Sequence, residues 1–272
     1  MQAPQGMPPK MAIPGVKKLI AVASGKGGVG KSTVAANLAL ALRMHGCQVG
    51  LMDADIYGPS VPHMFGLGLV DQNTTPFPIE KYGLKLMSMG FLVDPNQAVI
   101  WRGPKVAQAV GAFLAQIQWG QLDFLIIDLP PGTGDAQLTL TQQAPLTGAI
   151  IVTTPQEISL IDARKGLRMF DEVKVPVLGV IENMSWFLGD DGKRYEIFRH
   201  GGGTKLALEA KVPLLGEIPI DARVAECGDA GEPIVSKYRE SPIAEAYLKL
   251  ARSVIEASSQ VSESAQLPEV QL

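Results

Sequence analysis

A glycine-rich stretch with two lysines and two hydroxyl residues offers the clearest chemistry in this sequence. It reads Gly25-Lys26-Gly27-Gly28-Val29-Gly30-Lys31-Ser32-Thr33. Residues 25–32 fit the phosphate-loop pattern G-x-x-x-x-G-K-S/T, in which glycines let backbone N–H groups turn inward around phosphate oxygens. Lys31 is placed to reach the β- and γ-phosphates of a nucleotide, and the Ser32 hydroxyl is placed to ligate Mg²⁺. The stretch therefore predicts a nucleotide site.

Three aspartates come at the ends of apolar runs that read as strands. Asp53 and Asp55 follow residues 49–52, and Asp128 follows residues 124–127. Ligands bind at the carboxyl ends of parallel strands, and Asp128 has the form of a Walker B acid that binds Mg²⁺ directly or through water. Asp53 and Asp55 alternate along the chain, so both can face the nucleotide if the strand persists. There a carboxylate can hold a Mg²⁺-bound water or orient the attacking water; a solvated strand end is the alternative.

Two loops and an amide are further candidates for sensing the nucleotide. Residues 56–60 follow Asp55, and a proline–glycine loop at 130–135 follows Asp128. Gly132 can offer its backbone N–H to the γ-phosphate, which would make this loop a sensor of ATP against ADP. Asn183 ends another apolar run, and its amide can both donate to and accept from an adenine edge. A capping or turn role is the alternative for Asn183.

Other polar residues carry weaker signals. Arg102 can contact phosphate or a partner, or can be an ordinary surface arginine. His200 has no acid or nucleophile linked to it by a motif, which favours a loop-stabilising role. Cys47 is predicted at a turn between a helix and a strand, and Cys227 in a late loop. Their separation favours structural roles for both cysteines.

The elements that must position these residues alternate between apolar runs and helical periodicity. Strands are predicted at 19–23, 49–52, 84–89, 124–128, 149–152, 177–181 and 214–218, and helices up to 45, at 105–118, at 158–170, from 204 and at 242–258. This alternation predicts an α/β fold with a single doubly wound, mostly parallel sheet of about seven or eight strands. Residues 66–83 and 184–203 break the rhythm. The expected organisation is a flexible leader at 1–16, one domain at 17–258 and a mobile tail at 259–272.

Composition excludes several classes of protein. The chain has 272 residues, of which 46% are hydrophobic, and a net charge of −3, which argues against a strongly basic nucleic-acid surface. No apolar run approaches the ~18 residues that cross a bilayer, and the amino terminus lacks the apolar core of a signal peptide. The two cysteines have no metal-ligand spacing and suit a reducing compartment. We therefore expect a cytoplasmic protein that binds neither nucleic acid nor membrane.

Five strings of residues, in this order, resemble the Mrp/ApbC-type family of deviant Walker A P-loop ATPases, described as iron–sulfur cluster carriers and related to the MinD and ParA ATPases. The strings lie at 25–32, 53–60, 101–104, 128–135 and 181–185. The resemblance covers about residues 16–255 and implies a MinD-like P-loop NTPase fold and a homodimeric, Mg²⁺-dependent ATPase. It implies that Lys26 reaches across the dimer interface to the partner's nucleotide. It also implies that Asp55 positions the attacking water, that Asp128 is the Walker B acid, and that Asn183 reads adenine.

The chain departs from that family in two places. Many members carry a C-x-x-C pair shortly after the last string, where four thiolates from two subunits hold a bridging [4Fe–4S] cluster. Residues 186–193 of this chain contain no cysteine. The family therefore implies a cluster for which this chain lacks the usual ligands. Many bacterial relatives also carry an additional small N-terminal domain, where this sequence has the predicted leader.

Three hypotheses follow. The leading one is an ATPase that binds iron–sulfur clusters or transfers them to apo iron–sulfur proteins or cluster-assembly components. The second is a nucleotide-gated scaffold or chaperone for a metalloenzyme, without a cluster of its own. The third is a MinD- or ParA-like positioning ATPase, which would require a basic carboxyl-terminal helix or basic surface. Residues 261–272 carry acids and no lysine or arginine, which disfavours the third hypothesis.

Overall fold

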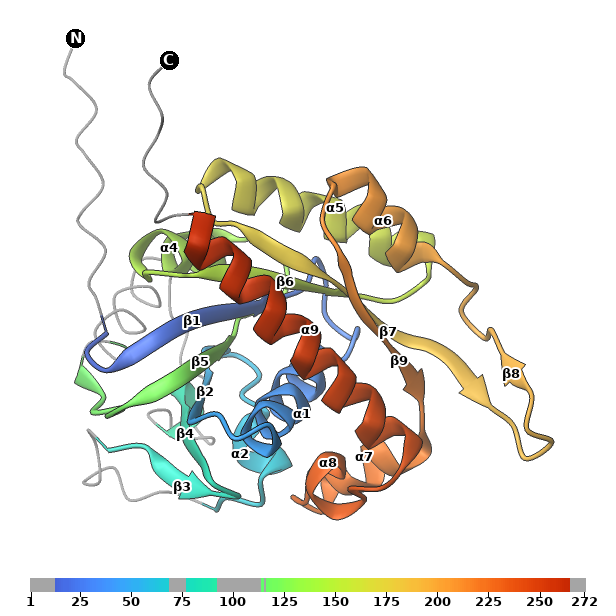
Figure 1. Ribbon diagram of the computed structural model, residues 1–272, viewed down its shortest axis with the longest axis horizontal. Coiled ribbons are helices and arrows are strands. Elements are labelled where there is room, and N and C mark those ends of the chain that lie inside the picture. Colours follow the sequence, from blue (N-terminus) through green and yellow to red (C-terminus); the bar gives the residue numbers. More distant parts are fainter. Residues whose placement is uncertain (1–12, 69–76, 92–113, 115, 265–272) are drawn as a thin grey trace, which may run out of the picture.

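Helices cover both faces of a twisted sheet in the computed structural model (Figure 1). The structure describes residues 13–68, 77–91, 114 and 116–264. The strands are β1 (Val16–Ala23), β2 (Val49–Asp53), β3 (Ile79–Lys81), β4 (Leu84–Ser88), β5 (Leu122–Asp128), β6 (Gly148–Thr153), β7 (Val177–Leu188), β8 (Arg194–Tyr195) and β9 (Leu214–Ile220). The helices are α1 (Lys31–Met44), α2 (Val61–Met64), α4 (Asp135–Gln143), α5 (Glu157–Glu172), α6 (Gly202–Ala210), α7 (Ala222–Asp229), α8 (Ile234–Lys237) and α9 (Pro242–Ser264), with a 3-10 turn η2 (Met89–Phe91).

The described strands form one nine-stranded sheet. Its order is β3-β4-β2-β5-β1-β6-β7-β8, and β9 also pairs with β7. Only β3 and β8 run antiparallel to their neighbours, and both are short strands within stretches that the sequence predicts to be irregular. The predicted doubly wound, mostly parallel α/β sheet is therefore confirmed, and the two short strands explain why it is wider than expected.

Two aliphatic layers fix the sheet between its helices. Along β1, Leu19 and Ala21 join the core beneath α5 and α6, whereas Ile20 and Val22 join the core beneath α1 and α9. This alternation follows from the two-residue period of a strand, and strands buried on both faces read as continuous apolar runs. The burial of these strands therefore holds the loops at their carboxyl ends in place.

The register of the central strands places the predicted acids side by side. Asp128 of β5 is level with Val22 of β1 on one side and with Asp53 of β2 on the other. The phosphate loop leaves the sheet one residue after Val22, at the end of β1. The glycine loop and two of the three acids therefore meet at one edge of the sheet, as the sequence predicts.

Several predicted boundaries were wrong. β7 does not stop near residue 181 but continues to Leu188 and pairs with β8, and η2 replaces the end of the predicted strand at 84–89. α9 does not end near residue 258 but continues to Ser264. At the predicted end of the helix, Ser258 is buried, and the Lys18 ammonium donates to the hydroxyls of Ser258 and Ser259. α2, α4, α7 and α8 were not predicted. The string at 101–104, which contains Arg102, lies outside the described residues, as does most of the predicted helix at 105–118.

None of the helices in the described parts of the chain combines the length and the apolar character that a bilayer span requires.

Candidate functional site

The phosphate loop connects β1 to α1 and can be built only with glycine at two positions. Gly30 caps α1 with a left-handed backbone, at φ +78°, and a Cβ there would lie 2.3 Å from Nδ2 of Asn183. A Cβ on Gly25 would lie 2.1 Å from the backbone of Asp162 in α5. The loop is therefore packed closely between β7 and α5. Its backbone N–H groups and the amino-terminal end of α1 are suited to bind an anion.

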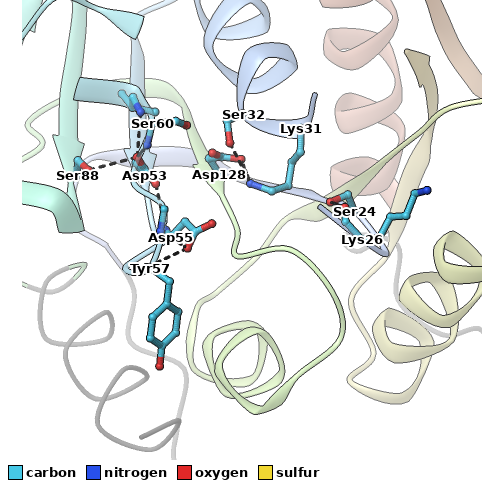
Figure 2. Close-up of polar contacts among 12 residues, drawn as sticks. Ser24, Lys26, Lys31, Ser32, Asp53, Asp55, Tyr57, Ser60, Ser88 and Asp128 are labelled. Atoms are coloured by element: carbon cyan, nitrogen blue, oxygen red, sulfur yellow. Dashed lines mark hydrogen bonds and ion pairs between the residues drawn. The ribbon is translucent and has the colours of Figure 1, made fainter. Parts of the chain in front are cut away.

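Lys31 and Asp128 form a buried ion pair at the base of this loop. Lys31, the first residue of α1, is 6% exposed, and Asp128 is fully buried. The Lys31 ammonium donates to Oδ1 of Asp128 and lies 3.3 Å from the Ser32 hydroxyl (Figure 2). Burial raises the pKa of Asp128, while Lys31 and Ser32 oppose that rise. The sequence-predicted Lys31, Ser32 and Asp128 are thus brought together.

Oδ2 of Asp128 is buried and has no hydrogen-bond partner among the described residues. A buried carboxylate oxygen without a partner is unfavourable, so such atoms commonly mark the place of a ligand, an ion or a water. Hard divalent cations such as Mg²⁺ take oxygen ligands. The Asp128 carboxylate and the neighbouring Ser32 hydroxyl therefore fit the predicted Mg²⁺ site.

Asp53 does not face the phosphate loop but holds the loop that follows it. β2 ends at Asp53, whose oxygens accept from the backbone N–H groups of Asp55 at 3.0 Å, Ser60 at 2.9 Å and Val61 at 3.0 Å. The Ser88 hydroxyl lies 3.3 Å from the same carboxylate. Burial and the neighbouring Asp128 raise the pKa of Asp53 to about 7. The reading of Asp53 as a solvated strand end is wrong, because its side chain is fully buried; a contact of Asp53 with the nucleotide stays a prediction.

Asp55 lies beyond the strand, so the expectation that it shares a strand face with Asp53 was also wrong. Its Oδ1 accepts from the backbone N–H groups of Tyr57 at 3.1 Å and Gly58 at 3.2 Å, which closes a tight turn. The charge of Asp55 nevertheless contributes to raising the pKa of Asp128. Figure 2 shows Asp55 and Tyr57 on the side of Asp53 away from Ser60.

Lys26 and Gly132 complete the surroundings of the loop. The Lys26 carbonyl accepts from the Ser24 hydroxyl at 2.9 Å, and its side chain points away from Lys31 and Asp128 (Figure 2). The backbone N–H of Gly132 donates to the Ser24 carbonyl at 3.0 Å, so the loop after β5 contacts the phosphate loop directly. The geometry places Gly132 beside the site and turns Lys26 outward.

Asn183 contacts the opposite side of the phosphate loop. Its Nδ2 donates to the Val29 carbonyl at 2.8 Å, and the side chain is buried. Beside it opens a cavity of about 610 Å³ between α1, the middle of β7, the end of β9, and α7. Ligand pockets usually have volumes of this order. The cavity adjoins Gly30 and Thr33 of the phosphate loop, so one bound molecule can contact both.

A clasp made by Glu182 lies at the base of the segment that follows Asn183. Glu182 is fully buried and accepts from the Ser185 hydroxyl and from the backbone N–H of Gly203. The clasp thereby ties the start of the β7–β8 hairpin to the first turn of α6. Nothing in the sequence marks Glu182 for this role, because its partner Gly203 becomes a neighbour only in the folded chain.

The β7–β8 hairpin between these anchors carries aromatic and basic side chains and no cysteine. The Arg194 guanidinium lies 4.1 Å from the ring centroid of Trp186. Exposed His200 lies 3.4 Å from the Glu196 carboxylate, in keeping with a loop-stabilising role. No cluster of three or more His, Cys, Asp or Glu residues suited to a metal ion occurs in the described ranges.

Both cysteines are free and lie in different elements. Cys47 is at the turn between α1 and β2, as predicted, whereas Cys227 is buried in α7 and not in a loop. Burial raises the pKa of both thiols. The two thiols lie in separate elements, so they do not form a pair of the kind that holds a cluster.

Comparison with known families and proteins extends this geometry. Residues 15–255 match the model of the NUBPL iron-transfer P-loop NTPases of the ParA group. The chain belongs to this family. It is 51% identical over 259 residues to the iron-sulfur cluster carrier protein of Synechocystis sp. The matched region covers 92% of this chain and 73% of that protein. It is 46% identical over 257 residues to the mouse iron-sulfur cluster transfer protein NUBPL, covering 92% of this chain and 81% of the relative.

Solved structures agree with the family assignment. A nucleotide-binding protein of Archaeoglobus fulgidus in complex with ADP is 40% identical and superposes with a TM-score of 0.71, covering 85% of this chain and 92% of that one. The cell division ATPase MinD of Pyrococcus furiosus superposes with a TM-score of 0.68 at 23% identity, covering 88% of this chain and 99% of that one. The second likeness concerns the fold alone. The predicted MinD-like P-loop NTPase fold is thereby confirmed.

Proposed function

We propose that this member of the iron–sulfur carrier family is a cytoplasmic, Mg²⁺-dependent ATPase that acts as a homodimeric switch and transfers iron–sulfur clusters to apoproteins. The observation that carries the nucleotide part is the buried Lys31–Asp128 pair beneath a glycine loop, in which Oδ2 of Asp128 has no partner within the described parts of the chain. A fold that needed no ligand here would gain by pairing or removing that oxygen. The relative crystallised with ADP has the same fold.

The roles of the residues follow from their positions. In phosphoryl transfer, proteins contribute positioning and charge neutralisation, with little covalent chemistry. The Lys31 ammonium would break its ion pair with Asp128 and move to the β- and γ-phosphates, whose charge it would neutralise. The backbone N–H groups of residues 25–33 would surround these phosphates. Ser32 and Asp128 would hold Mg²⁺, which when bound neutralises phosphate charge. Asp55 would orient the attacking water near this Mg²⁺ site, and Gly132 would exchange its bond to Ser24 for one to the γ-phosphate.

Lys26 supports the dimeric part of the proposal. Its side chain is half-buried, points away from its own chain's Lys31, and takes part in no ion pair that the structure describes. A lysine so placed can approach the phosphates of a second subunit that docks against the loop. That arrangement would complete the catalytic charge only in the ATP-bound dimer, which makes dimerisation a switch.

The cargo is proposed from the family to which the chain belongs. Membership of a family of cluster carriers and transfer proteins supports iron–sulfur clusters as the substrate. The described thiols do not form a ligand set, because Cys47 and Cys227 lie in separate elements and no cluster of three or more His, Cys, Asp or Glu residues occurs in the described ranges. This observation favours a second candidate function, in which the ATPase is a nucleotide-gated scaffold or chaperone that never holds the cluster itself.

Hydrolysis and dimerisation can be tested with single variants. A Lys31→Ala protein that remains folded by circular dichroism should lose ATP hydrolysis; hydrolysis at the parent rate would refute the site. An Asp55→Asn protein should bind ATP but hydrolyse it poorly, and should accumulate as a dimer in light scattering. An Asp55→Asn protein that stays monomeric with bound ATP would refute the dimeric switch.

The two candidate functions differ in one measurement. Anaerobic reconstitution with iron and sulfide should give cluster absorbance and bound iron if the chain carries clusters. A protein that binds ATP normally but acquires neither absorbance nor iron would favour the scaffold.

A further inference from the structure

A residue in the middle of β7 has a strained backbone. Met184 has φ +55°, and it is the only non-glycine residue within a described helix or strand whose φ is positive. Between Asn183 and Phe187 the pairing of β7 with β9 shifts register, so the strand bulges at this point. Left-handed backbones of non-glycine residues persist where their surroundings fix them, and they are common at functional sites. The contacts that fix Met184 therefore indicate what the bulge does.

Both neighbours of Met184 are held by hydrogen bonds. On one side, Nδ2 of Asn183 donates to the Val29 carbonyl at 2.8 Å. On the other side, the Ser185 hydroxyl donates to the buried Glu182 carboxylate, whose second oxygen accepts from a backbone N–H in the first turn of α6. The phosphate loop and the Glu182 clasp therefore fix the bulge from its two sides.

The Val29 carbonyl determines where the next backbone N–H of the phosphate loop points. A trans peptide is planar, and its C=O and N–H groups point in opposite directions. Asn183 binds the carbonyl of the Val29–Gly30 peptide, so the Gly30 N–H points away from the Asn183 amide. Gly30 is the cap residue of α1, where unpaired backbone N–H groups are suited to bind an anion. The direction of one proposed phosphate ligand thus depends on how the Asn183 amide is held.

We propose that Glu182 is a positioning residue for the phosphate loop. Its clasp holds Ser185 toward α6, which keeps Met184 in the left-handed turn and directs the Asn183 amide to the loop. The Gly30 N–H is thereby oriented before the phosphates bind, so binding does not have to order it. The inference rests on the proposed nucleotide function and extends it to a buried carboxylate whose described hydrogen bonds lie outside the loop.

Two variants of Glu182 separate the geometry of the clasp from its charge. Their affinity for ADP is measured by calorimetric titration, which avoids hydrolysis, on protein that is folded by circular dichroism. Glu182→Met keeps the size of the side chain but removes both acceptors, so ADP binding should weaken about tenfold or more. Glu182→Gln keeps an acceptor for α6, and its amide can donate to the Ser185 hydroxyl, so affinity should stay within about twofold of the parent. Equal losses in the two variants would assign the effect to charge and overturn the clasp as its cause.

The matched control is Glu217→Met. Glu217 is level with Glu182 on the neighbouring strand β9, so the variant makes the same chemical change one strand away from the clasp. Its affinity for ADP should equal that of the parent.

Gly203→Ala opens the clasp from α6 with the carboxylate intact, and keeps the test decisive if Glu182→Met does not fold. A Cβ on Gly203 would lie 2.7 Å from the Cβ of Glu182 and 3.0 Å from its Oε2. ADP binding should therefore weaken in this variant also. Because both substitutions break the same contact, the double variant should bind ADP no more weakly than the weaker single variant.

The Gly30 amide reports the geometry of the loop directly. In protein with isotope-labelled glycine, the Gly30 amide resonance should shift when ADP saturates the parent or Glu217→Met. It should shift less in saturated Glu182→Met and Gly203→Ala. A role of Glu182 in folding alone would leave the shift of the bound state unchanged.

Two further results overturn the inference in distinguishable ways. If Glu182→Met and Gly203→Ala bind ADP as tightly as the parent, with the same Gly30 shift, the clasp does not position the loop, while the phosphate site stands. If the parent itself binds no ADP, the proposed nucleotide function fails and this inference fails with it.

Discussion

The buried pair of Lys31 and Asp128 gives the most demanding test of the site, because it requires no nucleotide. Replacing Lys31 with methionine keeps the length of the side chain and removes its charge. Asp128 is then left fully buried, with one oxygen that lacked a partner already and another that has lost one. Removing one member of a buried ion pair typically costs about 3–5 kcal/mol. We expect a loss of that order in the free energy of unfolding.

The double variant distinguishes a charge effect from a packing effect. Lys31→Met with Asp128→Asn removes both charges, and replacement of a whole buried pair is often close to neutral. The double variant should therefore be more stable than Lys31→Met alone. The two single effects should deviate from additivity by about 0.5–3 kcal/mol, which is the range for residues in direct contact.

Urea unfolding of the nucleotide-free protein, with a chelator present, measures these free energies. The control is Lys17→Met, which removes a lysine from a surface pair with Asp123 in which the Lys17 side chain is 71% exposed. It should change stability little, because solvent screens exposed pairs. The reasoning is refuted if the Lys31 and Asp128 effects add within about 0.5 kcal/mol, or if Lys17→Met costs as much as Lys31→Met.

Two further predictions concern the loops beside this pair. Gly30→Ala should weaken ADP binding and lower the free energy of unfolding by more than about 1 kcal/mol, because its Cβ would displace the Asn183 amide at a left-handed position. Gly27→Ala, whose Cβ would meet nothing within 4 Å, is its control, and equal effects in the two variants would contradict the argument. The pKa of Asp53, raised to about 7 by burial and by Asp128, means that the folded state holds a proton that the unfolded state has lost above pH ~4. Stability should therefore fall as the pH rises from ~4 to ~7, by up to about 1.4 kcal/mol per unit, and Asp53→Asn should flatten that slope; parallel urea-unfolding profiles for the two proteins would rule this out.

The parts of the site that the sequence predicts are those set by local chain geometry. The glycine loop and Lys31 depend on neighbouring residues, and the run ending in Asp128 is a strand with little freedom to point elsewhere. Local chain geometry does not predict the positions of the Asp53 and Asp55 side chains. Their alternation implied a shared strand face, but Asp53 binds backbone N–H groups of the following loop and turns the chain before Asp55 is reached.

The features that the sequence could not predict depend on contacts between distant segments. β7 extends to Leu188 because Phe187 pairs with Tyr195 and Ile220, and no local pattern in residues 184–203 specifies those partners. The sequence likewise does not predict that the Tyr247 hydroxyl has no partner among the described residues, because a tyrosine in an amphipathic helix is predicted as an ordinary core residue. Short helices such as α7 are fixed by caps and packing more than by periodicity, so their residues read as loop.

The Glu182 clasp fixes both ends of the segment between Ser185 and Gly203, and within the described parts of the chain the turn at its far end, residues 189–193, is attached only through β7 and β8. Doubling the length of a flexible loop costs only about 0.6 kcal/mol. A longer turn bearing a C-x-x-C pair can therefore replace residues 189–193 without altering β7, which carries Asn183, or Ile197 and Phe198 of the cavity wall. Such a graft would add a pair of thiols to the chain and leave its proposed nucleotide site intact.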